Sequence, residues 1–241
     1  MALHEVVAAL RCMPHASNRR LMVGVLMSGK TLAGHANRHS GRYPRREAVA
    51  GIFISDPRVL NLVHYHPEDP SHIVEDVRRI VDLAGPRLDG IQLNVPWPDP
   101  SRIEAIRHMF PRLYLVLQVG PGAMAEILRI RKGWRMEFFR ALARYTASID
   151  AVLIDGSGGT GTPLDVRKTM PWLRVAYDIP GIEVGVAGGL DAATVPRIGP
   201  LAATFPELNI DAEGRLRIPP GDMLSLARVK EYLTESHRIL H

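Results

Sequence analysis

The chain has 241 residues, of which 46% are apolar and 23% charged, so it can bury a large core. No apolar run reaches the roughly eighteen residues of a membrane span, and the N-terminus lacks the layout of a signal peptide. The single cysteine, Cys12, excludes an intrachain disulfide and fits a reducing compartment, so we expect a cytoplasmic protein.

The net charge is +5 and the isoelectric point is near 9.6. An arginine- and histidine-rich stretch, residues 35–46, follows the first apolar run, and basic surfaces of this kind favour anionic ligands. No helix-turn-helix or RNA-binding signature accompanies it. We therefore expect a small anionic metabolite as partner, with neither nucleic acid nor membrane, and the sequence leaves a homodimer open.

Seven apolar, largely β-branched runs are typical of buried strands. They cover residues 21–28, 59–65, 90–95, 113–119, 151–155, 183–187 and 208–211. Amphipathic stretches lie between them, beginning with a short helix over residues 4–13. A long helical stretch over 123–146 is interrupted near Lys132-Gly133, and Asp222 is expected to cap a closing helix over 223–237.

Strands that alternate with helices at this spacing predict a parallel sheet with right-handed crossovers. A doubly wound sheet is the rival, but no G-x-G-x-x-G follows the first strand. The length suits a single-domain (β/α)8 barrel, the TIM barrel, over residues 1–241, with a short N-terminal helix and a long basic loop after the first strand. The eighth strand is expected at residues 50–54.

Ligands of such sheets bind at the carboxyl ends of the strands. Asp155 ends one strand and is followed by Gly158, Gly159 and Gly161, while Gly188 and Gly189 end the next strand. Glycines let the main chain approach a ligand closely, and the second pair precedes a predicted helix N-terminus that favours an anion. The alternative is that these glycines only turn strand into helix.

Four motifs resemble one family. They are GIQLNVPWP at 90–98, VLIDGSGGTGTPLD at 152–165, VGVAGGLDAATV at 184–195 and LNIDAEGRL at 208–216. Their order and spacing resemble the phosphoribosylanthranilate isomerase family of ribulose-phosphate-binding barrels. The resemblance implies a (β/α)8 barrel, a phosphate site in the last loops, and Asp155 as general acid.

Three departures separate the chain from that family. Its catalytic cysteine has no counterpart, because Met27-Ser28-Gly29-Lys30 stands at the end of the first strand. The last loop carries Asp211 and Glu213, two carboxylates that would repel a phosphate. The family histidine after Gln-Leu is replaced by Asn94. We therefore do not expect the tryptophan-pathway reaction itself.

Candidates for the missing base are Lys30, His64 and His66, the histidines alternating along one strand. Gln92, Asn94 and Gln118 supply neutral hydrogen-bonding groups, either for a ligand or for one another.

The sequence predicts an isomerase or lyase that transfers protons on a small anionic or phosphorylated sugar-like substrate. We expect neither a metal nor a cofactor. One alternative is a non-catalytic barrel that binds a ligand or partner protein. Another is a metal-dependent lyase, since two histidines and a carboxylate suffice for several metals.

Overall fold

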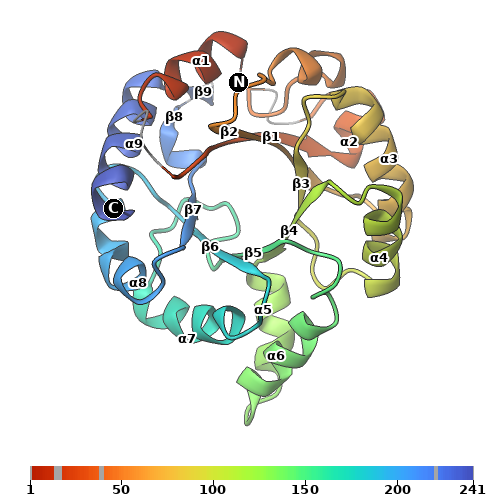
Figure 1. Cartoon of the computed structure of the whole chain (residues 1–241), viewed down its shortest axis with the longest axis vertical. Helices are drawn as coiled ribbons and strands as arrows, with labels where there is room; N and C mark the ends of the chain where they lie inside the picture. The colour runs from red at the N-terminus through yellow and green to blue at the C-terminus, as the bar shows by residue number, and fades with distance from the viewer. Residues whose placement is uncertain (1, 14–17, 38–40, 220–221, 241) are drawn as a thin grey trace.

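A computed structural model describes residues 2–13, 18–37, 41–219 and 222–240. Seven parallel strands follow one another around a sheet in the order β1 to β7, and each pairs with its neighbour in sequence. Figure 1 shows the sheet curled into a ring with the helices outside it. The strand-helix alternation explains this arrangement, since each crossover places the next parallel strand beside the last.

All seven predicted strands are confirmed. Their bounds are β1 (Leu21–Ser28), β2 (Val59–His66), β3 (Gly90–Leu93), β4 (Tyr114–Val119), β5 (Ala151–Asp155), β6 (Glu183–Ala187) and β7 (Asn209–Asp211). Strands β2 to β6 are mostly buried on both faces, which is why their sequences are continuously apolar instead of alternating, whereas β7 is only partly buried.

The helices surround the ring. They are α1 (Leu3–Leu10), α2 (Gly29–Leu32), α3 (Ile73–Ala84), α4 (Pro100–Met109), α5 (Pro121–Leu128), α6 (Trp134–Ala143), α7 (Val166–Tyr177), α8 (Gly199–Thr204) and α9 (Leu226–Leu240). Short 3₁₀ turns add η1 (Arg46–Gly51), η2 (Pro70–His72), η3 (Val195–Ile198) and η4 (Gly214–Leu216). The N-terminal helix is confirmed, and so is the break at Gly133, whose φ is 86°. None of the described helices has the length and apolar character to cross a membrane.

The expected strand at residues 50–54 is wrong. The chain forms η1 there, and Val49, Ile52 and Phe53 are buried. Their i, i+3, i+4 spacing puts them on one side of a helical turn, which packs against α3. The apolar composition of this segment suggested a strand, but the spacing of its apolar residues is that of a helix.

The expected cap at Asp222 is also wrong. Asp222 has a φ of 52°, and the residues after it form β9 (Met223–Leu224), which pairs antiparallel with β8 (Arg217–Ile218). The final helix begins at Leu226, and Ser225 Oγ accepts a long hydrogen bond from Arg228 N at 3.4 Å. Of the basic loop, residues 38–40 lie outside the described part of the chain.

The ring has an opening between β1 and β7, which do not pair with each other within the described residues. Arg19 bridges the opening at the amino-terminal ends of these strands, donating to the carbonyl oxygens of Leu208 at 3.0 Å and Pro206 at 2.5 Å. Helix α1 packs against α9 beside this opening. A side chain and two helices thus occupy the edge at which a further strand would pair.

Two apolar clusters hold the fold together. The larger lies between the strands and the surrounding helices. The smaller lies inside the ring and consists of Leu62, Val116, Ala151, Leu153 and Ala187, with Met22, Leu60 and Tyr114 packed against it. The inner cluster includes two small alanines and leaves part of the interior open as a cavity, unlike the packed core of a closed barrel.

Candidate functional site

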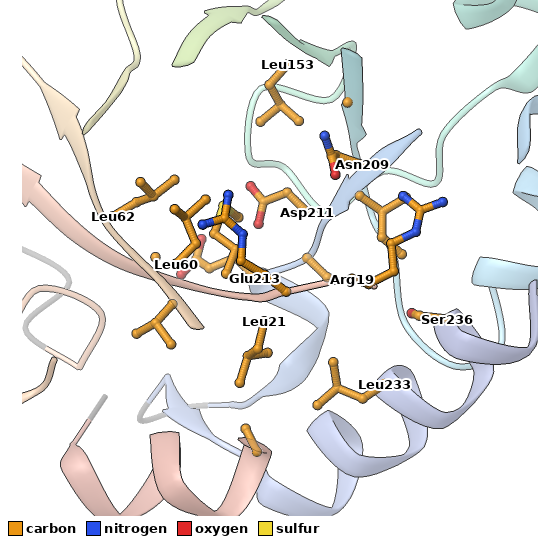
Figure 2. A pocket seen from close by; sticks show the side chains of 18 of the residues that line it. Arg19, Leu21, Leu60, Leu62, Leu153, Asn209, Asp211, Glu213, Leu233 and Ser236 are labelled. Carbon is orange, nitrogen blue, oxygen red and sulfur yellow. The ribbon is translucent and has the colours of Figure 1, made fainter. Parts of the chain in front are cut away.

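A cavity of about 620 Å³ occupies the interior of the ring and extends into the opening between β1 and β7. Figure 2 shows Leu62, Leu153 and Asp211 facing a common space from β2, β5 and β7. Residues from α1 and α9, such as Val6 and Leu233, line its outer side. Its size falls within the range of small-molecule sites. Polar side chains line it at both ends of the strands, with Arg19, Arg20 and Glu183 at the amino ends and His64, Gln92 and Asp211 toward the carboxyl ends.

His64 is one of these polar groups. Its ring is buried, and Nε2 has no hydrogen-bond partner. Burial lowers the pKa of His64 to about 4, although the charge of Glu213 acts in the opposite direction. The imidazole is therefore neutral near pH 7. Gly24 on the neighbouring strand makes room for it, since a Cβ at that position would collide with His64 Cε1 and Nε2.

Asp211, at the end of β7, is the second polar group of the cavity. Burial, together with the charges of Glu213 and Asp155, raises the pKa of Asp211 to about 7, against a smaller opposing effect of a hydrogen bond from Ala212 N. Asp155 and Asp211 both pair in register with Ala187, so the small alanine separates two carboxylates at one level of the sheet. Two strand spacings put their main chains about 10 Å apart.

The carboxylate of Asp155 accepts four hydrogen bonds. Oδ1 accepts from Ser157 N at 3.0 Å, Ser157 Oγ at 2.7 Å and Gly158 N at 3.1 Å, and Oδ2 accepts from Gln118 Nε2 at 2.8 Å. The carboxylate consequently fixes the start of the loop after β5. It is one of the two acidic side chains that the strand ends bring together.

The neutral polar residues form a chain that runs from β3 to β5. Gln92 Nε2 donates to Asn94 Oδ1 and to Gln118 Oε1, each at 3.1 Å, and Gln118 donates onward to Asp155. The structure thus brings all three predicted amides together. Gln92 is buried and lines the cavity, so this network supports the wall beside His64.

The two glycine loops pack against each other. Gly188 and Gly189 have φ values of 131° and 53°, and a Cβ on Gly189 would lie 2.5 Å from Gly161 O and 2.6 Å from Thr162 O. Gly158, Gly159 and Gly161 also adopt positive φ. Leu164 N donates to Gly188 O at 3.1 Å. Gly189 is therefore required for the close approach of two loops at the carboxyl end of the sheet, and the other glycines supply the positive φ of their turns.

The segment after Gly188-Gly189 differs from the predicted helix. It is a 3₁₀ turn, η3, followed by the six-residue α8. Asp191 Oδ1 accepts from Thr194 N at 2.9 Å, and Asp191 N donates to Thr194 Oγ1 at 2.8 Å. Arg215 donates to Asp191 Oδ2 at 2.9 Å and to Gly161 O at 3.1 Å. Asp191 thus caps the start of this segment and joins it to Arg215.

The other predicted residues lie nearer the surface. Lys30 is exposed in α2, and His66 is exposed with Nδ1 2.8 Å from Asn94 O. Ser28 Oγ is buried and accepts from Thr31 N and from Asn37 Nδ2. Neither Lys30 nor His66 lines the cavity, so the structure separates them from His64 and Asp211. Across the described ranges, no three histidine, cysteine or acidic side chains gather in a way that could hold a metal ion.

Sequence reasoning named Glu213 only as a charge that would repel a phosphate, and it did not single out Arg42 or Tyr232. Glu213 lines the cavity and pairs with Arg217 Nε at 2.9 Å and Arg42 Nη1 at 3.7 Å. Arg42 Nε is buried without a hydrogen-bond partner. Tyr232 of α9 lines the cavity, and burial together with the charge of Asp211 raises its pKa. Only the apolar periodicity of the last helix could have signalled Tyr232, because the contacts span distant segments.

Comparison with known proteins places the fold but not the chemistry. No protein-family model and no curated protein matches the chain. Several solved structures do match the chain. A phosphoribosyl anthranilate isomerase in complex with reduced 1-(o-carboxyphenylamino)-1-deoxyribulose 5-phosphate aligns with a TM-score of 0.58 and 16% identity, over 98% of this chain and 94% of that one.

Tryptophan synthase subunit alpha from Legionella pneumophila aligns at 0.59 and 12% identity, covering 99% of this chain and 86% of that one. A chitinase domain from Pyrococcus furiosus aligns at 0.59 and 10% identity, covering 98% and 89%. The fold is TIM-barrel-like. Identities this low establish architecture alone, since unrelated activities share the barrel.

Proposed function

We propose that the chain is an enzyme of the isomerase or lyase type that transfers protons at the carboxyl end of its barrel. The observation that carries this proposal is Asp211, a half-buried carboxyl group that lines the cavity and whose pKa is raised to about 7. A group with a pKa near the working pH is suited to both taking up and releasing a proton. Perturbed carboxyls in a cavity are common at catalytic sites, which supports the assignment.

The neighbouring residues have distinct roles in this proposal. Asp155 and Asp211 form a carboxylate pair in which the hydrogen bonds of Asp155 hold it in place while Asp211 exchanges the proton. His64 is neutral and offers Nε2 for one hydrogen bond to the substrate. Asp211 therefore takes the role of the base that the sequence assigned to Lys30, His64 or His66.

The proposed substrate is small and anionic or phosphorylated, and sugar-like. Asp155 and Asp211 make the site acidic at the ends of β5 and β7, so the anionic group of the substrate binds away from them, beside the glycine loops. The reacting carbon then lies above the carboxylate pair. This separation of charge avoids placing a phosphate directly beside two carboxylates.

Solvent exchange tests the proposal without knowledge of the product. The protein is incubated in D₂O with ribose 5-phosphate, ribulose 5-phosphate and related sugar phosphates, and deuterium bound to carbon is measured by mass spectrometry. The wild-type protein is expected to label at least one compound. Asp211→Asn lowers the rate by about 10² or more, since general acid-base groups contribute on that scale.

Asp82→Asn, an exposed carboxylate on α3, is the matched control and is expected to exchange at the wild-type rate. Absence of labelling across the panel contradicts the proposal. Labelling that persists in Asp211→Asn removes Asp211 from the chemistry.

One observation favours a second candidate, a barrel that binds a ligand or partner without catalysis. The amide chain and the start of η3 are satisfied by contacts within the protein. Soaking crystals with ribose 5-phosphate and with sulfate separates the two candidates. Density for both beside Gly188-Gly189 supports the phosphate-binding enzyme, whereas an unaltered loop favours the second candidate.

A further inference from the structure

A second feature of the molecule lies away from the cavity, on the outside of the ring. Helices α5 and α6 and their connection form a hairpin, which we call the α5–α6 tip (residues 128–140). In Figure 1 this hairpin protrudes from the ring beyond the neighbouring helices. Residues 128–133 are all exposed, and the break at Gly133 reverses the chain there.

The α5–α6 tip carries most of the net charge of the chain. It contains five exposed basic residues, which are Arg129, Arg131, Lys132, Arg135 and Arg140. Its one acidic residue, Glu137, lies 3.9 Å from Arg140. The tip is therefore +4, in a protein whose total is +5. A positive field this concentrated attracts an extended anionic surface.

Large apolar side chains are exposed among these charges. Leu128 is 50% exposed, Ile130 42%, Met136 55% and Phe139 39%. Met136 and Phe139 are three residues apart, so they share one face of α6. Four exposed apolar side chains within thirteen residues exceed the scattered single ones that soluble surfaces normally show.

The opposite face of α6 is firmly packed. Phe138 is fully buried, its ring centroid lies 4.7 Å from that of Trp172 on α7, and the centroid of Trp134 lies 4.5 Å from the same ring. The outward position of Met136 and Phe139 is thus set by the anchoring of α6. The apolar side chains are presented on a rigid support.

We propose that the α5–α6 tip docks the protein on an anionic lipid surface. Basic side chains reach phosphate headgroups, while Leu128, Ile130, Met136 and Phe139 enter the boundary with the acyl chains. A nucleic acid would satisfy the arginines but would leave these apolar chains in water. The combination of charge and apolar exposure therefore fits lipid better. The sequence pattern did not reveal this surface, because these residues are typical of an interrupted amphipathic helix.

Cosedimentation with vesicles tests this inference independently of any enzymatic activity. The full chain is mixed with vesicles of phosphatidylcholine alone and with vesicles that contain about 40% phosphatidylglycerol. We expect binding to the second kind only, weakening as salt rises. The double variant Arg131→Glu/Lys132→Glu lowers the partition coefficient at least about tenfold, because each basic residue near the surface contributes to it.

Arg167→Glu/Lys168→Glu, an exposed pair on α7, is the matched control for a change of total charge and is expected to bind like wild type. Ile130→Asp and Met136→Asp test the apolar part, and both are expected to weaken binding while the circular dichroism spectrum stays unchanged. Equal binding to both vesicles, or equal loss in the two double variants, overturns the inference. So does tighter binding of a single-stranded oligonucleotide that the Arg131→Glu/Lys132→Glu variant loses.

Discussion

Replacing Asp211 with asparagine should make the protein more stable above neutral pH. The carboxyl group of Asp211 has a pKa of about 7 in the folded protein against an ordinary value of 3.8, so the folded state holds a proton that the unfolded state has released between these values. Raising the pH through that window favours unfolding. The stability that protonation provides is complete below about pH 4 and is lost as the pH rises past 7.

The size of the effect follows from the same two values. A rise from 3.8 to about 7, at about 1.4 kcal/mol per unit, corresponds to about 4 kcal/mol in the free energy of unfolding. This is an upper bound, because Asp211 faces the cavity and keeps some contact with solvent. Asparagine has nearly the same shape and cannot ionise, so it removes the penalty.

Urea unfolding of the wild type and of Asp211→Asn, at a series of pH values from about 4 to about 8.5, measures this difference in the free energy of unfolding. The two proteins should be equally stable near pH 4, and the variant should be more stable by up to about 4 kcal/mol above pH 8. Other carboxyl groups titrate in both proteins and cancel in the difference. Asp82→Asn, an exposed site, should show no such trend. A stability difference that does not change with pH would refute the assignment of a buried, uncompensated carboxylate.

Three further substitutions test the geometry. Gly24→Ala should lower stability by about 1–3 kcal/mol in thermal unfolding because its methyl group meets the ring of His64, and the double variant with His64→Ala should recover most of the loss. Arg19→Met should speed amide hydrogen exchange along β1 and β7 while β3 to β5 stay protected, and uniform exchange would contradict a local bridge. Asp155→Ala should cost about 1–3 kcal/mol by leaving the loop donors Ser157 N and Gly158 N without their acceptor, with exchange rising first in the loop after β5.

The strands and their order could be predicted from the sequence because most of them are continuous apolar runs buried on both faces. The run that ends at Asp155 and the run that ends at Gly188-Gly189 therefore located the carboxyl end of the sheet. The alternation of Gln92 and Asn94 correctly placed both amides on one face, where they are hydrogen bonded. The local sequence pattern was sufficient to predict features that depend on a single strand or helix.

The rest depended on contacts between distant segments. Residues 50–54 were apolar enough for a strand, and the packing of Val49, Ile52 and Phe53 beside α3 shows that their helical spacing decides the structure. His64 and His66 look equivalent in the sequence, yet one is enclosed by Gly24 and the other is exposed. The proton affinity of Asp211 arises from burial and from two other carboxylates, which no local motif encodes.

The contact of α1 with α9 has a consequence for how this molecule comes apart. Because β1 and β7 share no ladder of hydrogen bonds, the ring is closed on that side by the first and last helices and by the guanidinium group of Arg19. Local unfolding of α1 or α9 would therefore open the ring between β1 and β7. Helices α1 and α9, far apart in the sequence, are therefore essential for keeping the ring closed.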